Sequence, residues 1–189
     1  MLTVGLLGIG SVFVMQSHQH KTEVIEGRTQ ADQIVLFFDT IKSFDPAENY
    51  RSKAGDPTKD PDDQKFVDSA LNAGFNDFSD SFIELQLKQF FGKELITSWK
   101  SDISARTDVN EFSLITGLPH KAAMCHSFVA NLAKPPVHSI GHPDGLYKVS
   151  EGKPQKFVQI CSGINGANSK KISINYCNYL GGRDCSGRP

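Results

Sequence analysis

The 189-residue chain lacks three features that would assign a protein to a common class. Its 20 Lys and Arg nearly balance its 21 Asp and Glu, so no excess of positive charge attracts nucleic acid, and no specific nucleic-acid binding is expected. No basic segment precedes the apolar N-terminus and no small-residue cleavage site follows it, which excludes the usual secretory signal peptide. The opening apolar stretch ends at Met15, short of the roughly 20 residues that span a membrane.

Cysteine is missing from the first 124 residues. The four cysteines of the chain are Cys125, Cys161, Cys177 and Cys185, and none belongs to a Cys-x-x-Cys pair of the kind that holds zinc from one tight turn. An even number of cysteines downstream of an apolar N-terminus favours two disulfides formed in an oxidising compartment. Free thiols or a zinc site are the alternatives.

Catalytic motifs are also missing. There is no Gly-x-Ser-x-Gly, no phosphate-binding glycine loop and no paired-carboxylate signature, and Cys125 and His126 are helical neighbours that do not face each other. We therefore expect no enzyme activity and no cofactor. A membrane-anchored periplasmic enzyme or metal-binding domain is the alternative class, with His138, His142 and Asp144 as its first candidates. Because Gly141 and Pro143 break any helix over this segment, we expect no metal site there.

The strongest pattern present is a long N-terminal helix. Residues 1–15 are apolar all round, and residues 16–43 are polar with apolar positions repeating at three and four residues. Gly27 weakens the middle, and Asp45-Pro46 ends the helix near Ser43. The repeating positions, which we expect to pack on a globular head, are Ala31, Ile34, Val35, Phe38 and Ile41.

Residues 44–189 are predicted to form this head. The expected elements are a polar loop at Asn49–Gln64, a short helix at Phe66–Leu71, a segment at Phe82–Phe91 that fits helix or strand, a helix within Leu118–Leu132, and strands at Leu95–Trp99, Glu111–Thr116, Leu146–Val149 and Lys171–Tyr176. Helices set apart in sequence from a run of strands indicate an α+β fold with residues 1–43 as its spine.

Several short motifs resemble the type IV pilins. The start MLTVGLLGIG resembles the part of a prepilin helix that follows the leader cleavage site and a short apolar piece ending in glutamate. The resemblance places Met1 a few residues inside the mature helix, and we expect the leader and those first residues to be missing from the chain. The second half resembles the type IVb subgroup of bundle-forming and toxin-coregulated pilins, through Phe91-Gly92, Glu111-Phe112-Ser113-Leu114, Gly117-Leu118-Pro119, Ala122-Ala123-Met124-Cys125, Phe157–Cys161 and Lys171–Tyr176.

This resemblance implies a pilin fold, with a long N-terminal helix on an antiparallel sheet and a disulfide-bonded C-terminal region. It implies pairing of Cys125 with Cys161, and we expect Cys177 to pair with Cys185. It also implies a structural subunit of a bacterial pilus that serves adhesion, bundling or DNA transfer. The residues implied to lie in the inner membrane, and later in the filament core, are Leu2, Val4, Leu6, Leu7, Ile9, Val12, Phe13 and Val14.

The implied partners are copies of the same chain in a helical filament, the inner membrane before assembly, and the pilus assembly machinery. The implied location is the inner membrane and then the extracellular pilus. The extra cysteine pair and the polar stretch 49–64 depart from the family pattern, so a minor pilin or a secretion pseudopilin that primes assembly is the alternative within the class. Gly163–Lys170 and Tyr176–Tyr179 are expected to be exposed loops.

Overall fold

A computed structural model describes residues 3–44, 75–108, 111–149, 157, 159–162 and 170–177, with side chains of the first helix described from Ser17 onward. The helices are α1 (Thr3–Ser43), α4 (Asp80–Phe91) and α5 (Ala122–Leu132), with 3₁₀ turns η1 (Phe75–Asp77) and η3 (Gln159–Cys161). The strands are β1 (Ser104–Asp108), β2 (Glu111–Gly117), β3 (Ser139–His142), β4 (Gly145–Lys148) and β5 (Lys171–Cys177). The predicted loop 49–64 and short helix 66–71 lie outside the described residues.

The strands form one antiparallel sheet in the order β1-β2-β5-β3-β4. Register sets which side chains share a face, because neighbours directly opposite each other point the same way. Phe112 lies opposite Tyr176, and Leu114 lies opposite Ile174, which in turn lies opposite Ile140. These buried apolar side chains form the sheet's share of the hydrophobic core.

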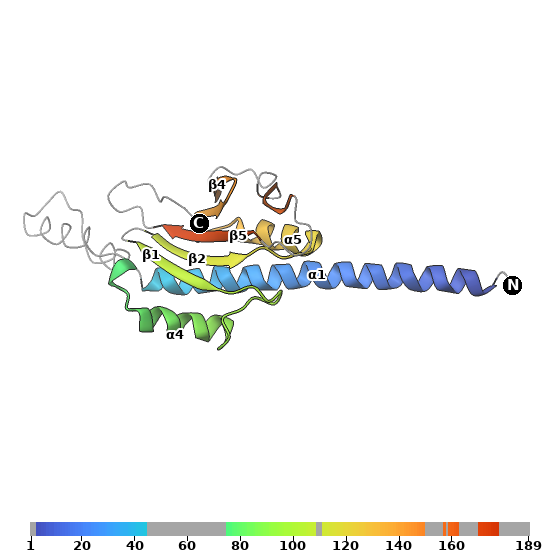
Figure 1. The fold of residues 1–189 in the computed structure, drawn as a ribbon, viewed down its shortest axis with the longest axis horizontal. Helices are drawn as coiled ribbons and strands as arrows, with labels where there is room; N and C mark the ends of the chain where they lie inside the picture. Colours follow the sequence, from blue (N-terminus) through green and yellow to red (C-terminus); the bar gives the residue numbers. More distant parts are fainter. Residues whose placement is uncertain are drawn as a thin grey trace, which may run out of the picture.

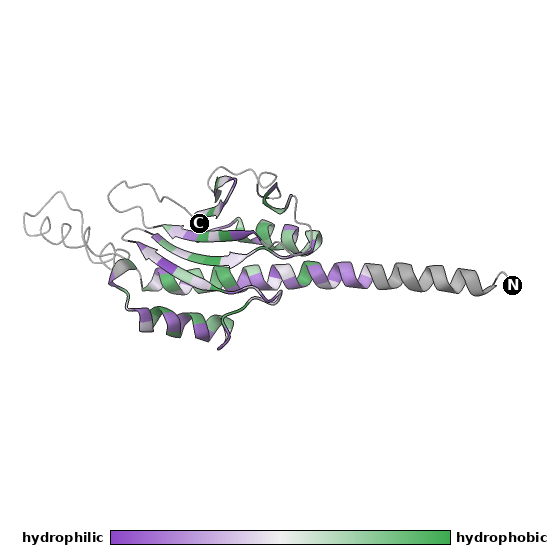
Figure 2. Cartoon of the chain, viewed as in Figure 1, coloured by the Kyte–Doolittle hydropathy of each residue, from purple (hydrophilic) through white to green (hydrophobic). Residues whose placement is uncertain are grey.

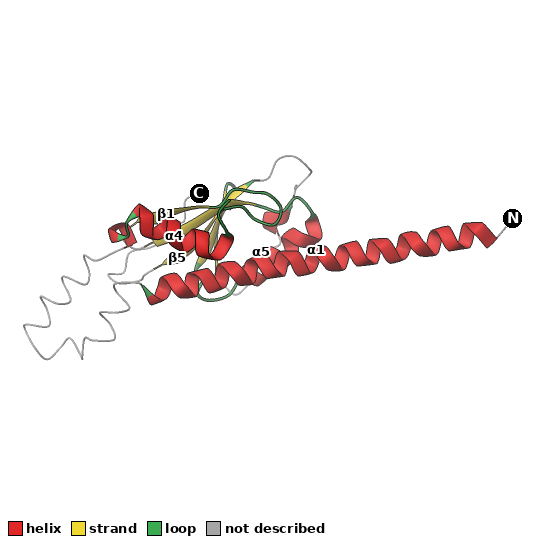
Figure 3. Cartoon of the chain, turned by 90° about the horizontal axis from the view of Figure 1, so that it is seen from below, coloured by secondary structure: helices red, strands yellow, loops and turns green. Residues whose placement is uncertain are grey.

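Helix α1 lies along this apolar face and then extends beyond the head, as Figures 1 and 3 show. Its unbroken course to Ser43 agrees with the sequence prediction. Helix α5 packs closely against α1, and α4 lies on the other side of α1. The architecture is therefore α+β, with an N-terminal helix packed on a five-stranded antiparallel sheet.

The segment 82–91, which fitted helix or strand, is helical. Ser79 caps α4 by accepting the N–H of Phe82 on its side chain, and Gly92 ends the helix with a φ of 80°. An N-cap serine and a left-handed glycine at the end are standard helix boundaries. The helix predicted within Leu118–Leu132 begins only at Ala122, past Pro119. The predicted strands at 111–116, 146–149 and 171–176 match β2, β4 and β5 to within a residue or two.

The strand predicted at Leu95–Trp99 is wrong. This segment is a tight turn with a bridge between Ile96 and Asp102, and both Leu95 (φ 50°) and Lys100 (φ 63°) have left-handed backbones. The segment is apolar because the turn inserts Trp99 into the core. Its side chains do not alternate along a strand. The sequence pattern predicts neither β1, which is short and polar, nor β3, where only the absence of a helix is expected.

The opposite face of the sheet carries a buried polar row that the sequence pattern did not reveal. Ser113, Asn175 and Ser139 lie opposite one another on β2, β5 and β3, and all three are buried. Asn175 Nδ2 donates to Ser139 Oγ at 3.1 Å, and Ser113 Oγ donates to Glu111 Oε1 at 2.6 Å. Tyr176, expected in an exposed loop, belongs to β5 and is buried on the apolar face.

Candidate functional site

The N-terminal half of α1 projects from the head as a single helix (Figure 1). The helix backbone includes all the residues that the pilin resemblance implied for a membrane and filament core, except Leu2, which lies outside the described residues. In the described chain, no helix combines the length and mean hydropathy required to cross a bilayer. Figure 2 shows that α1 is polar where it leaves the head. His18 and His20 belong to this part of the helix and are exposed.

An aromatic cluster attaches the C-terminal half of α1 to the sheet and to α4. Phe37 is fully buried, and its ring lies 5.4 to 5.7 Å from those of Phe90, Phe91 and Phe112. Phe38 also contacts Phe112, at 6.2 Å. Tilted and edge-on ring pairs at these distances each add about 0.5–1.5 kcal/mol beyond area burial.

The helix positions predicted to pack on the head all contribute to this attachment. Four of them are fully buried and Val35 is partly buried; the four are Ala31, Ile34, Phe38 and Ile41. Sequence reasoning missed Phe37. Its position three residues after Ile34 and four before Ile41 is the signal that would have found it, since these spacings share one face of a helix.

Helix α5 crosses α1 at Gly27, where the two backbones touch. A Cβ atom added to Gly27 would lie 2.3 Å from the carbonyl oxygen of Met124 and 3.1 Å from the backbone nitrogen of Phe128. No side chain fits in that space, so glycine is the residue that permits this crossing. The sequence had marked Gly27 only as a weak point in the helix, and the structure gives it a positive role.

Polar contacts flank this crossing on both sides. Lys121 Nζ lies 2.9 Å from Glu23 Oε1, and Ser127 Oγ donates to the carbonyl oxygen of Val24 at 2.7 Å. Beyond the far end of α5, Lys134 Nζ lies 2.7 Å from Asp32 Oδ1. The hydrogen bond from Lys134 keeps the pKa of the Asp32 carboxyl below its usual value, against a smaller opposing effect of desolvation. Glu23 thus marks the start of the described contacts between α1 and the head.

Two glutamines of α1 bind backbone groups on the α4 side. Gln33 Nε2 donates to the carbonyl oxygen of Phe90, and Gln30 Nε2 donates to Gln33 Oε1 at 3.1 Å. Gln30 Oε1 also accepts the N–H of Ser98 at 3.1 Å. Gln30 is buried and Gln33 is half-buried, and together the two amides tie α1 to the end of α4 and to the turn that follows it.

Apolar side chains remain exposed on α1. Ile25 is 63% exposed and Leu36 is 58% exposed. They are eleven residues apart, which is close to three full turns, so they point to the same side of the helix. The residues that precede Ile25 on this side of the helix are polar: Thr22, Lys21 and His18.

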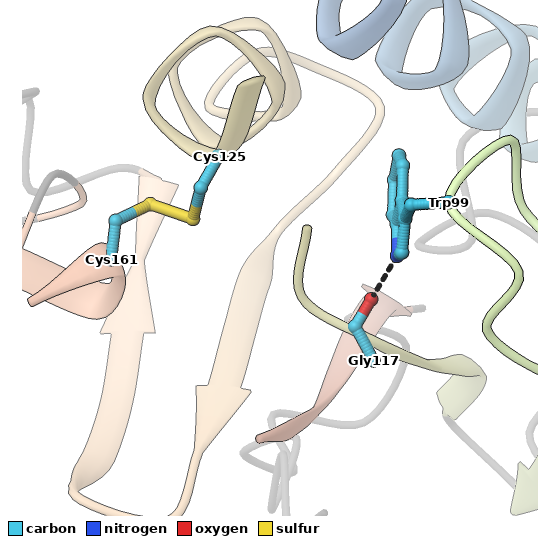
Figure 4. Close-up of a disulfide and its surroundings, with 4 residues drawn as sticks. All are labelled: Trp99, Gly117, Cys125 and Cys161. Atoms are coloured by element: carbon cyan, nitrogen blue, oxygen red, sulfur yellow. Dashed lines mark hydrogen bonds between the residues drawn. A yellow bond between two sulfur atoms is a disulfide. The ribbon is translucent and has the colours of Figure 1, made fainter. Parts of the chain in front are cut away.

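A disulfide joins Cys125 of α5 to Cys161 of η3 (Figure 4), which confirms the implied pairing. Close by, the Trp99 indole N–H donates to the carbonyl oxygen of Gly117 at 2.9 Å, and the Trp99 ring packs on Phe128 at 4.9 Å. Cys177 at the end of β5 is also in a disulfide. Its expected partner Cys185 lies outside the described residues, so that pairing stays a prediction.

The histidines named as metal candidates serve different backbone groups. His138 Nδ1 accepts the N–H of Cys177 at 2.9 Å, whereas His142 Nδ1 accepts the N–H of Asp144 at 3.2 Å. Among the described residues, no group of three or more His, Cys, Asp and Glu is placed to hold a metal ion. His126 is exposed while its neighbour Cys125 is buried, so the two side chains do not meet.

Comparison with known proteins identifies no protein similar to this chain. No protein-family model matches the chain, and searches of curated proteins and of solved structures found no significant match.

Proposed function

We propose that the chain is a structural subunit of a type IV pilus of the b subgroup, held in the bacterial inner membrane by the N-terminal part of α1 before it polymerises into a surface filament. The single observation that supports this most is the form of α1. One helix is apolar at its start, projects beyond the head, and is fixed to a disulfide-bonded α+β head from Glu23 onward.

The physical argument concerns where an apolar projecting helix can be stable. A helix that leaves lipid must enter another dry environment, and a bundle of identical helices provides one. Ile25 and Leu36 give α1 two exposed apolar side chains at the level of the head. A bundle that buries both would contribute roughly 1.5–3 kcal/mol for each side chain. In such a bundle each subunit would contact the next one head-to-tail. Head-to-tail contacts whose rotation does not close into a ring propagate a fibre.

The proposed location follows from the same features. The apolar start of α1 fits the inner membrane before assembly, and two disulfides fit the oxidising space outside it. The head would then lie on the filament surface, where the disulfide-bonded region beyond Cys125 carries contacts for adhesion, bundling or DNA transfer. Copies of the chain and the assembly machinery are the proposed partners.

A charge placed on the exposed face of α1 tests the proposal. We expect Leu36→Asp to abolish surface filaments, because an unpaired carboxylate inside an apolar helix bundle costs more than the bundle gains at that position. Leu146→Asp is the matched control, since Leu146 is also exposed but lies on β4 at the edge of the sheet. Filaments are counted by electron microscopy of cells that express each variant. Normal filaments made of the Leu36→Asp chain would contradict the proposal.

A further inference from the structure

His138 lies just before β3 and is held by backbone bonds on both sides. Its N–H donates to the carbonyl oxygen of Asn175 at 2.9 Å, and its carbonyl oxygen accepts the N–H of Val149 at 2.8 Å. The imidazole lies beside the ring of Tyr176, with 5.2 Å between ring centroids. The backbone of His138 is thus fixed by β5 and by Val149, the residue that follows β4.

A contact of the imidazole with β5 depends on its protonation state. Its Nδ1 accepts the backbone N–H of Cys177 at 2.9 Å. An imidazole nitrogen accepts a hydrogen bond only when it carries no proton, and both nitrogens become donors in the cation. Protonated His138 would therefore turn an N–H toward the N–H of Cys177. Cys177 is the last residue of β5 and belongs to a disulfide.

We propose that His138 is a pH-sensitive latch: its neutral imidazole holds the end of β5 through the Cys177 N–H, and protonation releases that end together with the disulfide that Cys177 carries. The release is local, because the backbone ladder of Ser139, Ile140 and Gly141 with β5 involves no titrating group. The exposure of Cys177 and its disulfide then depends on the acidity of the surroundings.

The groups around His138 set the range of pH over which the latch acts. Lys42 of α1 and the Tyr176 ring of β5 face the imidazole, whereas Glu111 of β2 accepts a hydrogen bond from Ser113 on the other face of the sheet. Burial lowers the pKa of His138 below its usual 6.5, and the positive charge of Lys42 lowers it further. On acidification the unfolded chain therefore binds a proton first, so the stability contributed by the neutral imidazole declines from pH 6.5 down to the folded-state pKa.

His142 at the other end of β3 shows why the latch is assigned to His138. Its Nδ1 lies 3.2 Å from the Asp144 carboxylate as well as from the Asp144 N–H, and Lys170 lies 3.2 Å from the same carboxylate. The Tyr147 ring of β4 lies 6.5 Å away. Burial lowers the pKa of His142 while Asp144 opposes that effect. Protonated His142 would thus gain an ionic partner for its Nδ1, the Asp144 carboxylate. The Nδ1 of protonated His138 would instead face the N–H of Cys177.

Reduction of the two disulfides in the full chain, held in detergent micelles, tests the latch. A phosphine reductant is applied at pH 7.5 and at pH 5, and peptide mapping measures how fast Cys177 and the Cys125–Cys161 bridge become reduced. The second rate is the internal reference. We expect the rate ratio of Cys177 to the reference to rise about fivefold at pH 5, the effect of losing one hydrogen bond of typical strength.

His138→Asn is the matched variant, because its amide oxygen accepts a hydrogen bond near the position of Nδ1 and does not titrate. Its rate ratio is expected to be equal at the two pH values. An equal ratio in the wild type, or the same rise in His138→Asn, would overturn the proposal. If the variant misfolds, fast reduction of the reference bridge reveals it. Nitrogen NMR of the wild-type histidines then decides, since a proton on Nδ1 of His138 at pH 7.5 is incompatible with the latch.

Discussion

Replacing Gly27 by alanine has two opposing effects on the free energy of unfolding, one from helix propensity and one from packing. In an exposed helix, replacing glycine by alanine stabilises by roughly 0.5–1 kcal/mol, because alanine loses less backbone freedom on folding. At Gly27 the added methyl group would lie 2.3 Å from the Met124 carbonyl oxygen, a backbone atom that cannot rotate away. The two helices would have to separate, and the contacts on both sides of their crossing would lengthen.

We therefore expect Gly27→Ala to lower the free energy of unfolding by about 1–3 kcal/mol, the usual cost of overpacking. Chemical denaturation followed by circular dichroism measures this change. Thr29→Ala is the control, because Thr29 is exposed on the same helix and its replacement tests helix propensity alone. A Gly27→Ala chain more stable than the wild type would mean that α5 does not cross α1 in backbone contact.

At the scale of the elements, each helix is held to α1 by a different kind of contact. Helix α5 is held to α1 by backbone approach and by the ion pairs at its two ends, and the Cys125–Cys161 disulfide ties its other side to η3. Helix α4 is held by rings around Phe37 and by the amide of Gln33 on the Phe90 carbonyl oxygen. Loss of either set should therefore loosen one helix without unfolding the other.

The disulfide gives a quantitative prediction for the α5 side. Its cysteines are separated by 36 residues, and the chain-entropy model assigns such a loop about 4 kcal/mol. We expect the Cys125→Ala, Cys161→Ala double variant to lose about this much in urea unfolding. A Cys177→Ala, Cys185→Ala variant removes the smaller predicted loop and should lose less, about 2.5 kcal/mol. A reversed order of the two losses would contradict this account of the framework.

Gln33 gives the corresponding prediction for α4. Gln33→Leu would leave the Phe90 carbonyl oxygen and Gln30 without their described amide partner, at a cost of about 0.5–1.5 kcal/mol for each part-buried hydrogen bond. Hydrogen exchange measured by mass spectrometry should show faster exchange in α4 and unchanged exchange in α5. Equal acceleration in both helices would mean that the effect is global and that the glutamines do not act on α4 in particular.

The long periodic elements were predictable from the sequence, and the exceptions have physical causes. Helix α1 and strands β2 and β5 combine length with clear periodicity, which is the primary signal of secondary structure. The turn at Leu95–Trp99 imitates a strand because it supplies core side chains, so only its backbone reveals the difference. Strand β1 alternates in burial, but its residues are mostly polar and give no hydrophobic period. It is a strand because it pairs with its neighbour β2.

The candidate site was predictable in part. The period of α1 gave most of the residues that attach it to the head, and Phe37 could have been added on the same spacing. The role of Gly27 could not, because it depends on where α5, about a hundred residues later, crosses the helix. The use of His138 as a hydrogen-bond acceptor likewise depends on tertiary contact with β5.

At the scale of the whole molecule, the described contacts of the head involve only the part of α1 that follows the projecting stretch. The described contacts of α1 with the head begin at Glu23 and Val24, and the apolar N-terminal stretch lies ahead of them. Stability of the head should therefore not require the N-terminal half of α1, whereas assembly of the filament should require it.

We expect a chain that begins at Ser17 to keep the stability of the head within about 0.5 kcal/mol, because no described contact with the head is removed. The same chain should remain monomeric in sedimentation velocity and should not enter filaments. A large loss of stability would mean that the projecting half supports the head, and continued assembly would mean that filaments form through the head alone.

The central claim is that this chain builds a filament, and immunogold electron microscopy of material sheared from cells that make it tests that claim most directly. The account predicts gold label, raised against the head, along the whole length of thin filaments, and the chain as a major protein of the sheared fraction. Label at the filament tips alone would indicate the minor-pilin alternative. Filaments without any label, with the chain confined to the membrane fraction, would contradict the account.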